Sequence, residues 1–390
     1  MLILSTGAYS NANVSASTPT AEVLLHDPTA HNPVEQQCMS AYDDFLEHDW
    51  KRKACVGGAF IVVKGDQVIL VKTTGQKSTR TGEPVTENSV FRLGSVSKGF
   101  AGVLAGMLVE QGHIEWTDRV KDYMPTLCLA TPEATNALCI ENILSHSTGM
   151  VRHAYTNLIE DGKSITEIAA EFPEVPIVGR IGTSYAYQNA AYSLIEQVAT
   201  EATGESYDQL LENRIFTPLG MKNASCSYED ITSSDDVAQP HSYNRRQARI
   251  THKYYNSISS GGVNASIIDM GEWLKLLLGN YPELMDDEAL DAVFAPRVNT
   301  RRDRRYYNNW PGFRDSDYAI GWRVLDLGDR KLMHHGGYVN GYRSEIAIDR
   351  ENEIAICALF NSPCNYAKDV VPNFFQFYDS YAPTEGFAAP

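Results

Sequence analysis

The stretch Phe91–Phe100, FRLGSVSKGF, joins a short apolar run to the start of a helical pattern. Apolar residues recur at helical spacing over 97–110, so the sequence predicts a helix there. Ser95 therefore lies at or beside the N-terminus of that helix. Lys98 follows three residues later, and residues three apart on a helix share a face, so both side chains can enter one cleft.

A serine and a lysine at this spacing are able to carry nucleophilic chemistry. A serine hydroxyl becomes a good nucleophile only when a neighbouring base takes its proton, and a lysine can be that base once burial lowers its pKa. Backbone N–H groups at the helix N-terminus would stabilise the resulting oxyanion. Serine is also a favoured N-cap residue, so an ordinary helix start is the alternative. Taken alone, the spacing leaves both interpretations open.

The composition indicates a compact protein and limits its partners. The chain has 390 residues, of which 43% are hydrophobic, enough to bury one large core or two smaller ones. Its formal net charge of -16 argues against a nucleic-acid or anionic-membrane surface, because both need clustered Lys and Arg. No apolar run approaches the length of a membrane span. We therefore expect no nucleic-acid partner and no membrane span.

The N-terminus lacks the usual features of an export signal. Its apolar core is only Leu2-Ile3-Leu4, and no Lys or Arg precedes Lys51. We interpret residues 1–32 as an N-terminal tail, which could be the remnant of such a signal.

The cysteines predict no metal site. The chain has seven, none in C-x-x-C spacing, so neither a zinc ribbon nor a thioredoxin-like motif is indicated. An odd number leaves at least one thiol free. Buried thiols are the favoured interpretation of Cys128 and Cys139, and a disulfide between them that closes a small loop in an oxidising compartment is the alternative.

Strand patterns lie at both ends of the chain, with helical patterns between them. Residues 55–75 predict a hairpin that turns at 64–66, and residues 342–360 predict a second hairpin around Arg350 and Glu351. Further helices are predicted over 33–50, 189–204 and 365–381. We therefore expect an α/β (α+β) fold whose sheet is assembled from both chain ends.

The expected organisation has three parts after the tail. Residues 33–98 form the first part of an α/β domain, residues 99–300 form a largely helical region, and residues 301–390 complete the α/β domain with a hairpin and a helix.

Two further motifs change the interpretation of the serine. Tyr187-x-Asn189 stands just before a predicted helix, and His335-Gly336-Gly337 leads into the C-terminal hairpin. The order of the three motifs resembles that of the penicillin-recognising serine hydrolases, in the branch with class C β-lactamases, serine DD-peptidases, D-aminopeptidases and related esterases. Other stretches that look like landmarks of this family are CIENILSHSTGM (139–150), RIFTPLGMKNAS (214–225), SSGGVNASIIDMGEWL (259–274) and YAIGWRV (318–324).

The resemblance implies a β-lactamase/transpeptidase-like fold, with an antiparallel sheet flanked by helices, and a mechanism without metal or cofactor. It implies that Ser95 is the acylated nucleophile and Lys98 its base or proton relay. Tyr187 would share in proton transfer and Asn189 would hold the substrate amide. The oxyanion hole would consist of the backbone N–H groups of Ser95 and Tyr338.

The third motif departs from the β-lactamase pattern. His335 and Gly336 stand where β-lactamases typically have Lys and Thr or Ser, so a permanent charge and a hydroxyl that help hold a carboxylate are missing. A histidine of ordinary pKa is mostly neutral at pH 7. We therefore expect uncharged esters to react more readily than penicillins, with Arg343 as the alternative ligand for a carboxylate. The neighbouring His334 leaves the register of the motif open.

The leading hypothesis is a serine hydrolase that forms an acyl-enzyme on an amide, peptide or ester, in the manner of a β-lactamase, a DD-peptidase or an esterase. The alternative is a non-catalytic binding or scaffolding relative. A metal hydrolase is disfavoured because the chain has no H-E-x-x-H helix. The resemblance also implies a periplasmic or secreted protein. It leaves the oligomeric state open, and it gives His146 a structural hydrogen-bonding role.

Overall fold

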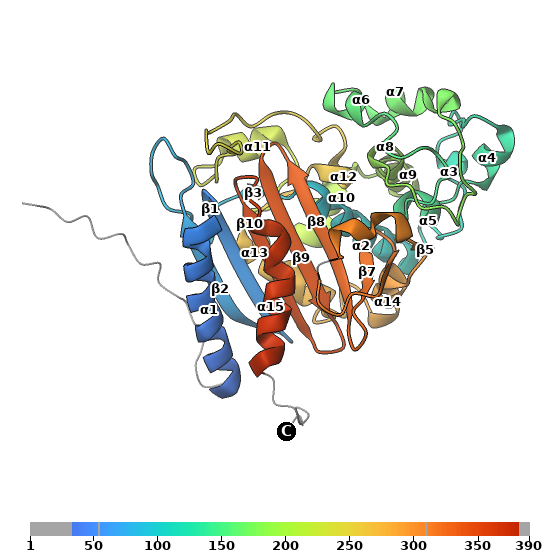
Figure 1. The fold of residues 1–390 in the computed structure, drawn as a ribbon. Helices are drawn as coiled ribbons and strands as arrows, with labels where there is room; N and C mark the ends of the chain where they lie inside the picture. Colours follow the sequence, from blue (N-terminus) through green and yellow to red (C-terminus); the bar gives the residue numbers. More distant parts are fainter. Residues whose placement is uncertain (1–32, 54, 309, 382–390) are drawn as a thin grey trace, which may run out of the picture.

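The computed structural model describes residues 33–53, 55–308 and 310–381. The predicted tail over 1–32, with its remnant of an export signal, lies outside them. One eight-stranded sheet organises the fold, in the order β2-β1-β10-β9-β8-β7-β6-β5, and neighbouring strands are antiparallel (Figure 1). The predicted α+β fold, with an antiparallel sheet flanked by helices, is confirmed.

The sheet joins the two ends of the chain. Strands β1 and β10, which come from opposite ends of the chain, pair with each other, and both predicted hairpins, β1–β2 and β9–β10, are confirmed. The strands are β1 (Gly57–Lys64), β2 (Gln67–Gly75), β5 (Val298–Asn299), β6 (Asp315–Tyr318), β7 (Arg323–Asp326), β8 (Lys331–Val339), β9 (Tyr342–Asp349) and β10 (Ile354–Phe360), with β3 (Phe91–Arg92) and β4 (Asn264–Ala265) paired separately. Strand β5 precedes residue 301, and the proposed part boundaries stay predictions.

Helices cover both faces of the sheet, and short helices make up most of the region between β3 and β5 (Figure 1). The helices are α1 (Pro33–Lys53), α2 (Ser97–Glu110), α3 (Val120–Tyr123), α4 (Pro132–Ala137), α5 (Ile140–Leu144), α6 (Thr156–Glu160), α7 (Ile165–Ala170), α8 (Asn189–Tyr192), α9 (Leu194–Thr203), α10 (Tyr207–Leu211), α11 (Tyr228–Ser233), α12 (Ile258–Gly261), α13 (Ile267–Leu277), α14 (Asp287–Phe294) and α15 (Ala367–Tyr381). Tighter or wider turns are η1 (Gly94–Val96), η2 (Phe172–Glu174), η3 (Glu212–Phe216) and η4 (Arg301–Tyr306).

The alternation of side chains along β10 divides the core into two layers. Ala355 and Cys357 belong to the layer that contains α2 and α13, whereas Ile354 and Ile356 belong to the layer under α1 and α15. Because both faces are covered, the strand is continuously apolar rather than alternating.

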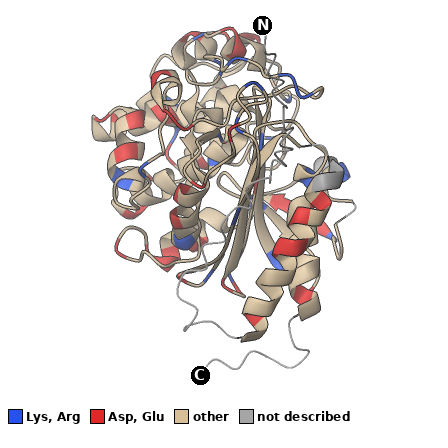
Figure 2. Ribbon diagram, turned by 90° about the vertical axis from the view of Figure 1, so that its left-hand side faces the viewer, with Lys and Arg blue, Asp and Glu red and all other residues tan. Residues whose placement is uncertain are grey.

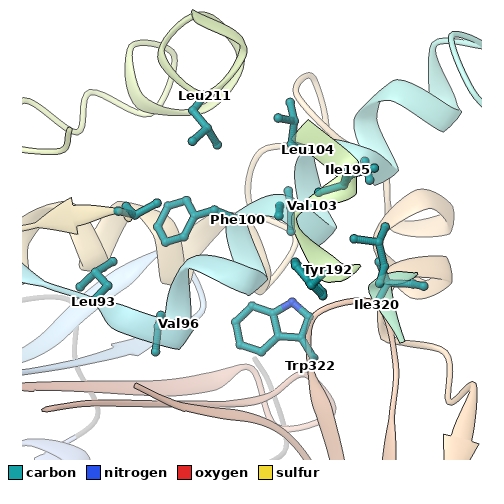
Figure 3. Packing of buried hydrophobic residues seen from close by; sticks show 14 of the residues in the cluster. Leu93, Val96, Phe100, Val103, Leu104, Tyr192, Ile195, Leu211, Ile320 and Trp322 are labelled. Atoms are coloured by element: carbon teal, nitrogen blue, oxygen red, sulfur yellow. The ribbon is translucent and has the colours of Figure 1, made fainter. Parts of the chain in front are cut away.

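Helix α2 is buried on nearly every side. Figure 3 shows Phe100 and Leu104 of this helix among apolar side chains from other elements. The Phe100 ring stacks on Trp273 with centroids 3.9 Å apart. A Cβ atom on Gly99 would come within 2.4 Å of the Trp322 ring, so only glycine permits this close packing. These contacts fix the position of the helix, and with it the position of its N-terminus.

Most predicted helices are observed, with one interruption. The helix predicted over 189–204 is divided into α8 and α9 at Ser193, whose hydroxyl donates to the carbonyl of Asn189 at 3.1 Å. A hydroxyl that bonds back to the preceding turn competes with the regular helical pattern.

Both interpretations of Cys128 and Cys139 are wrong, because the two residues form no disulfide and neither thiol is buried, Cys128 being exposed and Cys139 half-buried. The structure forms a disulfide between Cys55 and Cys364 instead, with Cα atoms 5.3 Å apart, and leaves Cys128 and Cys139 free. The reason is the β1–β10 pairing, because Cys55 precedes β1 and Cys364 follows β10 at the same end of the sheet.

Acidic residues are spread over helices on both sides of the sheet (Figure 2). Within the described part of the chain, no helix is both long and apolar enough to cross a membrane.

Reduction should destabilise the fold, because the disulfide closes a loop that contains nearly the whole described chain. Such a bridge contributes about 2–4 kcal/mol. We expect dithiothreitol to lower the melting temperature by several degrees in wild type and to have no effect on the Cys55→Ser/Cys364→Ser double variant. Thiol titration under denaturing conditions should give five free thiols before reduction and seven after. Seven thiols before reduction would contradict the pairing.

Candidate active site

Ser95 lies in η1, a single turn directly before α2. This turn approaches β8 backbone to backbone. Gly94 has φ +53°, and a Cβ atom there would lie 2.9 Å from the amide nitrogen of Tyr338. Only glycine combines a left-handed backbone with so close a contact. The predicted oxyanion-hole residues, Ser95 and Tyr338, therefore lie on segments in direct contact.

A second glycine completes this contact from the side of the sheet. A Cβ atom on Gly337 would meet the carbonyl oxygen of Leu93 at 2.1 Å. The Ser344 hydroxyl, from β9, donates to the same carbonyl at 2.6 Å. Gly337 is thus needed for packing, and the segment that carries the predicted nucleophile contacts β8 and is hydrogen-bonded to β9.

Lys98 has no exposed surface, and two acceptors hold its amine nitrogen. Its Nζ donates to Oδ1 of Asn189 and to the carbonyl of Ser260, both at 2.8 Å. Burial, followed by the nearby charge of Arg323, holds the pKa of Lys98 well below its usual range. A neutral amine has two N–H bonds, which these two acceptors satisfy, and its lone pair is left for a proton from the serine.

Tyr187 lies between Lys98 and a group of aromatic rings. Its ring centroid is 4.9 Å from Lys98 Nζ and 4.2 Å from the ring of His146. His146 is buried, and its Nδ1 accepts a hydrogen bond from the amide of Gln188 at 3.2 Å. His146 thus makes a structural hydrogen bond, as predicted. Asn189 begins α8 and also donates to the hydroxyl of Tyr254 at 3.3 Å.

His335 is buried and neutral. Its Nδ1 is 2.9 Å from the carbonyl oxygen of Gly336, and its Nε2 is 3.0 Å from the hydroxyl of Tyr318. A carbonyl only accepts, so Nδ1 carries the proton and Nε2 accepts from the tyrosine. Burial, and then the charges of Arg323 and Lys98, hold the pKa of His335 well below its usual range.

His334 belongs to the opposite face of the sheet. Its Nε2 is 3.0 Å from Oε2 of Glu345, and its Nδ1 is 2.9 Å from the hydroxyl of Tyr307. Successive residues of a strand point to opposite faces, so His335 is the histidine on the side of Lys98. This placement gives the third motif the register that begins at His335.

Arg343 and Gly336 are linked through one buried carboxylate. Nη2 of Arg343 donates to Oε1 of Glu345 at 2.6 Å, and Tyr306 donates to the same oxygen at 2.8 Å. A Cβ atom on Gly336 would meet Oε2 of Glu345 at 2.8 Å. A side chain at position 336 would therefore displace the carboxylate that neutralises Arg343.

A cavity of about 370 Å³ brings most of the predicted residues together. Lys98 and Asn189 are not among its lining residues and lie behind Tyr187. Several residues that line the cavity were not predicted as site residues. One of them, Arg323, belongs to the landmark stretch 318–324. Those that line the cavity are Ser95, Arg152, His153, Tyr187, Arg305, Tyr306, Tyr307, Arg323, His334, His335, Gly336, Gly337, Tyr338 and Arg343.

Two other observations limit the alternatives. A larger cavity of about 810 Å³ is lined by residues that range from Val90 to Ser234 in the sequence. None of the predicted site residues lines it, so cavity volume alone would select a different site. Among the described residues, no group of three or more His, Cys, Asp or Glu side chains is arranged to hold a metal ion.

The family model "Beta-lactamase" matches residues 42–374. The chain belongs to the β-lactamase family. Similar proteins include a hydrolase of unguisins from Aspergillus campestris, 26% identical over 73% of this chain and 55% of that protein, and a β-lactamase from Escherichia coli K12, 24% identical over 71% of this chain and 67% of that protein. Penicillin-binding protein 4 from Amycolatopsis lactamdurans is 30% identical over 43% of this chain and 44% of that protein.

The match to the fungal hydrolases spans only part of their length, 55% in one and 59% in another. Among solved structures, the octameric penicillin-binding protein homologue from Pyrococcus abyssi superposes with a TM-score of 0.74 at 20% identity, covering 86% of this chain and 77% of that chain. At this identity the similarity establishes the fold. The β-lactamase family assignment supports serine-hydrolase chemistry and leaves the substrate open.

Gly337→Ala should strongly slow acylation of Ser95, because the added carbon forces the turn away from β8. Loss of one oxyanion donor costs about 100-fold or more. Stopped-flow labelling with a fluorophosphonate measures this rate. Gly65→Ala is the control for a glycine substitution outside the site, since nothing lies within 4 Å of the added carbon, although Gly65, unlike Gly337, has a positive φ. Labelling of Gly337→Ala at the wild-type rate would show that the contact is not needed.

The acylation rate should rise with pH and reach its plateau well below pH 10.5, the ordinary lysine pKa, because burial favours the neutral amine of Lys98. The rate should fall as pH drops through this lowered pKa. His335 should add no inflection near pH 6.5, because its own pKa is also lowered. Lys98→Met should abolish this rise of the acylation rate with pH. If Lys98→Met still shows the rise and reaches its plateau at the same pH, the titrating group is another residue.

Proposed function

We propose that this member of the β-lactamase family is an active serine hydrolase that forms an acyl-enzyme on Ser95. One observation carries the proposal. Lys98 is fully buried, its neutral form is favoured, and two acceptors hold it beside the ring of Tyr187. Burial of a lysine without a carboxylate partner costs stability, and a protein that only binds a ligand has no use for it.

In the proposed reaction Lys98 accepts the Ser95 proton as the serine oxygen attacks the substrate carbonyl. The backbone N–H groups of Ser95 and Tyr338 stabilise the oxyanion. The scissile bond then breaks, Tyr187 gives its proton to the leaving group, and Lys98 passes the proton taken from Ser95 to Tyr187. Water attacks the acyl-enzyme next and gives its proton to the same pair of residues, the bond to the Ser95 oxygen breaks, and the proton returns to Ser95. Asn189 holds Lys98 through its Oδ1 in this scheme, and its amide nitrogen donates to the hydroxyl of Tyr254 at 3.3 Å, which leaves one N–H bond for the proposed contact with the substrate amide.

The proposed substrates are esters, amides or peptides. The hydrolase of unguisins and the β-lactamase among the relatives support hydrolysis of a carbonyl compound. Whether the chain acts as an esterase, a DD-peptidase or a β-lactamase is decided by the groups around the scissile bond.

We also propose that the protein functions in an oxidising compartment, as a periplasmic or secreted protein. The Cys55–Cys364 disulfide supports this location, because structural disulfides persist mainly outside reducing cytosol.

Intact-mass analysis after incubation with a fluorophosphonate, and separately with a penicillin, tests the function. We expect a stoichiometric fluorophosphonate adduct that peptide mapping assigns to Ser95 and that Ser95→Ala abolishes. Tyr187→Phe should retain the fold while its turnover falls by about 100-fold or more. An adduct on Ser97 or Ser145, or no adduct at all, would overturn the proposal. A penicillin adduct would identify β-lactams as acylating agents.

A further inference from the structure

The two acceptors that hold the Lys98 amine belong to different elements. Oδ1 of Asn189 belongs to α8, and the carbonyl of Ser260 belongs to α12. Helix α12 is a turn of four residues that packs against α2, η1, α8 and α9. The landmark stretch 259–274 begins in this turn, and the proposed reaction gives its serine side chains no role. Whatever holds the turn in place determines where the Ser260 carbonyl points.

A chain of buried hydroxyl groups joins the two acceptor residues. Ser260 donates to the hydroxyl of Ser257, Ser257 donates to the hydroxyl of Ser193, and Ser193 donates to the carbonyl of Asn189 at 3.1 Å. A hydroxyl carries one proton, so the bond from Ser193 to the carbonyl sets the direction of the other two bonds. The three serines are at most 1% exposed. The chain therefore fixes the α12 turn relative to Asn189.

Glu196 holds the same turn from α9. Its Oε1 accepts from the backbone N–H of Ser259 at 2.8 Å and from the Ser259 hydroxyl at 2.6 Å. Ser259 has no exposed surface, and its N–H group lies in the first turn of α12, where a helix offers no carbonyl partner. Glu196 thus supplies the acceptor for both polar groups of the residue that precedes Ser260.

The carboxyl group of Glu196 is costly to place at this position. Burial raises the pKa of Glu196 to about 7, against the lowering effect of the two bonds from Ser259. In the described chain, the titratable groups that interact with its charge are Tyr207 of α10 and Cys226, and burial raises the pKa of both, so neither is charged near pH 7. An apolar side chain of similar volume would avoid the cost of an ionised carboxyl group. What the carboxyl group provides is the contact with Ser259.

We propose that Glu196 is a positioning residue for Lys98. It holds the Ser259–Ser260 turn so that the Ser260 carbonyl accepts from the amine. This inference rests on the proposed hydrolase function, in which Lys98 is the base. Two fixed acceptors orient the two N–H bonds of a neutral amine, and the lone pair then points in one direction. A displaced turn would leave the amine free to rotate, so proton transfer from Ser95 would slow while substrate binding would change little.

The kinetics of labelling by a fluorophosphonate test this role, because the reagent reacts with the activated serine in one irreversible step. We expect Glu196→Ala to lower the maximal labelling rate about 10-fold or more, with little change in the reagent concentration that gives half of this rate. Glu196→Gln keeps an acceptor oxygen in the same place and should stay within about 3-fold of wild type. Ser259→Ala removes the hydroxyl bond and keeps the backbone bond, so its rate should fall between those of the two Glu196 variants.

A double variant separates positioning from a general structural role. If Glu196 acts through Lys98, Glu196→Ala should have no further effect on the slow residual labelling of Lys98→Met. A general distortion of the fold would slow labelling by the same factor in both backgrounds. Glu201→Ala is the matched control, since Glu201 is an exposed glutamate on the same helix, and it should label at the wild-type rate.

Three results would overturn the role of Glu196 while the hydrolase function stands. These are a wild-type maximal rate in Glu196→Ala, an equal loss in Glu196→Gln and Glu196→Ala, and a loss of the same size in the Lys98→Met background. If Glu196→Ala does not fold, Ser259→Ala decides the question, and labelling of Ser259→Ala at the wild-type rate overturns the role. If wild type does not label at Ser95, or if Lys98→Met labels as fast as wild type, the proposed function itself fails.

Discussion

The backbone contact between η1 and β8 is the constraint on which the rest of the site depends. Gly94 and Gly337 allow the turn before α2 to touch the strand without intervening side chains, and Ser344 of the neighbouring strand β9 donates to the carbonyl of Leu93, directly before the turn. On the other side, Gly99 sets α2 directly against Trp322. The serine turn is therefore held between the sheet and the buried helix, and the fold supplies the precision that oxyanion stabilisation requires.

The same burial determines the charge state of the site. Lys98 and His335 are both buried, and lost solvation, followed by the charge of Arg323, holds the pKa of each well below its usual range. The neutral form of the Lys98 amine is thereby favoured. In water a lysine would be charged and a poor base. The low solvent access that makes Lys98 costly to bury is also what makes it reactive.

The sequence predicted the local elements well because their signals are local. The helix over 97–110 and both hairpins follow from periodicity and turn residues, and they are observed. The pairing of β1 with β10 was expected only as a general assembly of the chain ends. The disulfide was predicted wrongly, because only that long-range pairing brings Cys55 to Cys364.

The site was less predictable than the fold, for a related reason. The motifs named Ser95 and Lys98, but neither Arg323 nor Glu345 has a local pattern that reveals its partners. Arg323 sits in a stretch noted only as a landmark, and its position beside Tyr187 depends on the register of β7 with β8.

The residues of the third motif are explained by the side chains that surround them. Glu345 occupies the space over Gly336 and neutralises Arg343, so a residue with a hydroxyl at position 336 and a free Arg343 are both incompatible with it. His335 is already bonded to Tyr318 at 3.0 Å, and a lysine at 335 would bury a further cation beside Lys98. The His-Gly-Gly sequence is therefore coupled to its surroundings, because Glu345 requires glycine at position 336 and Tyr318 already bonds the imidazole at position 335.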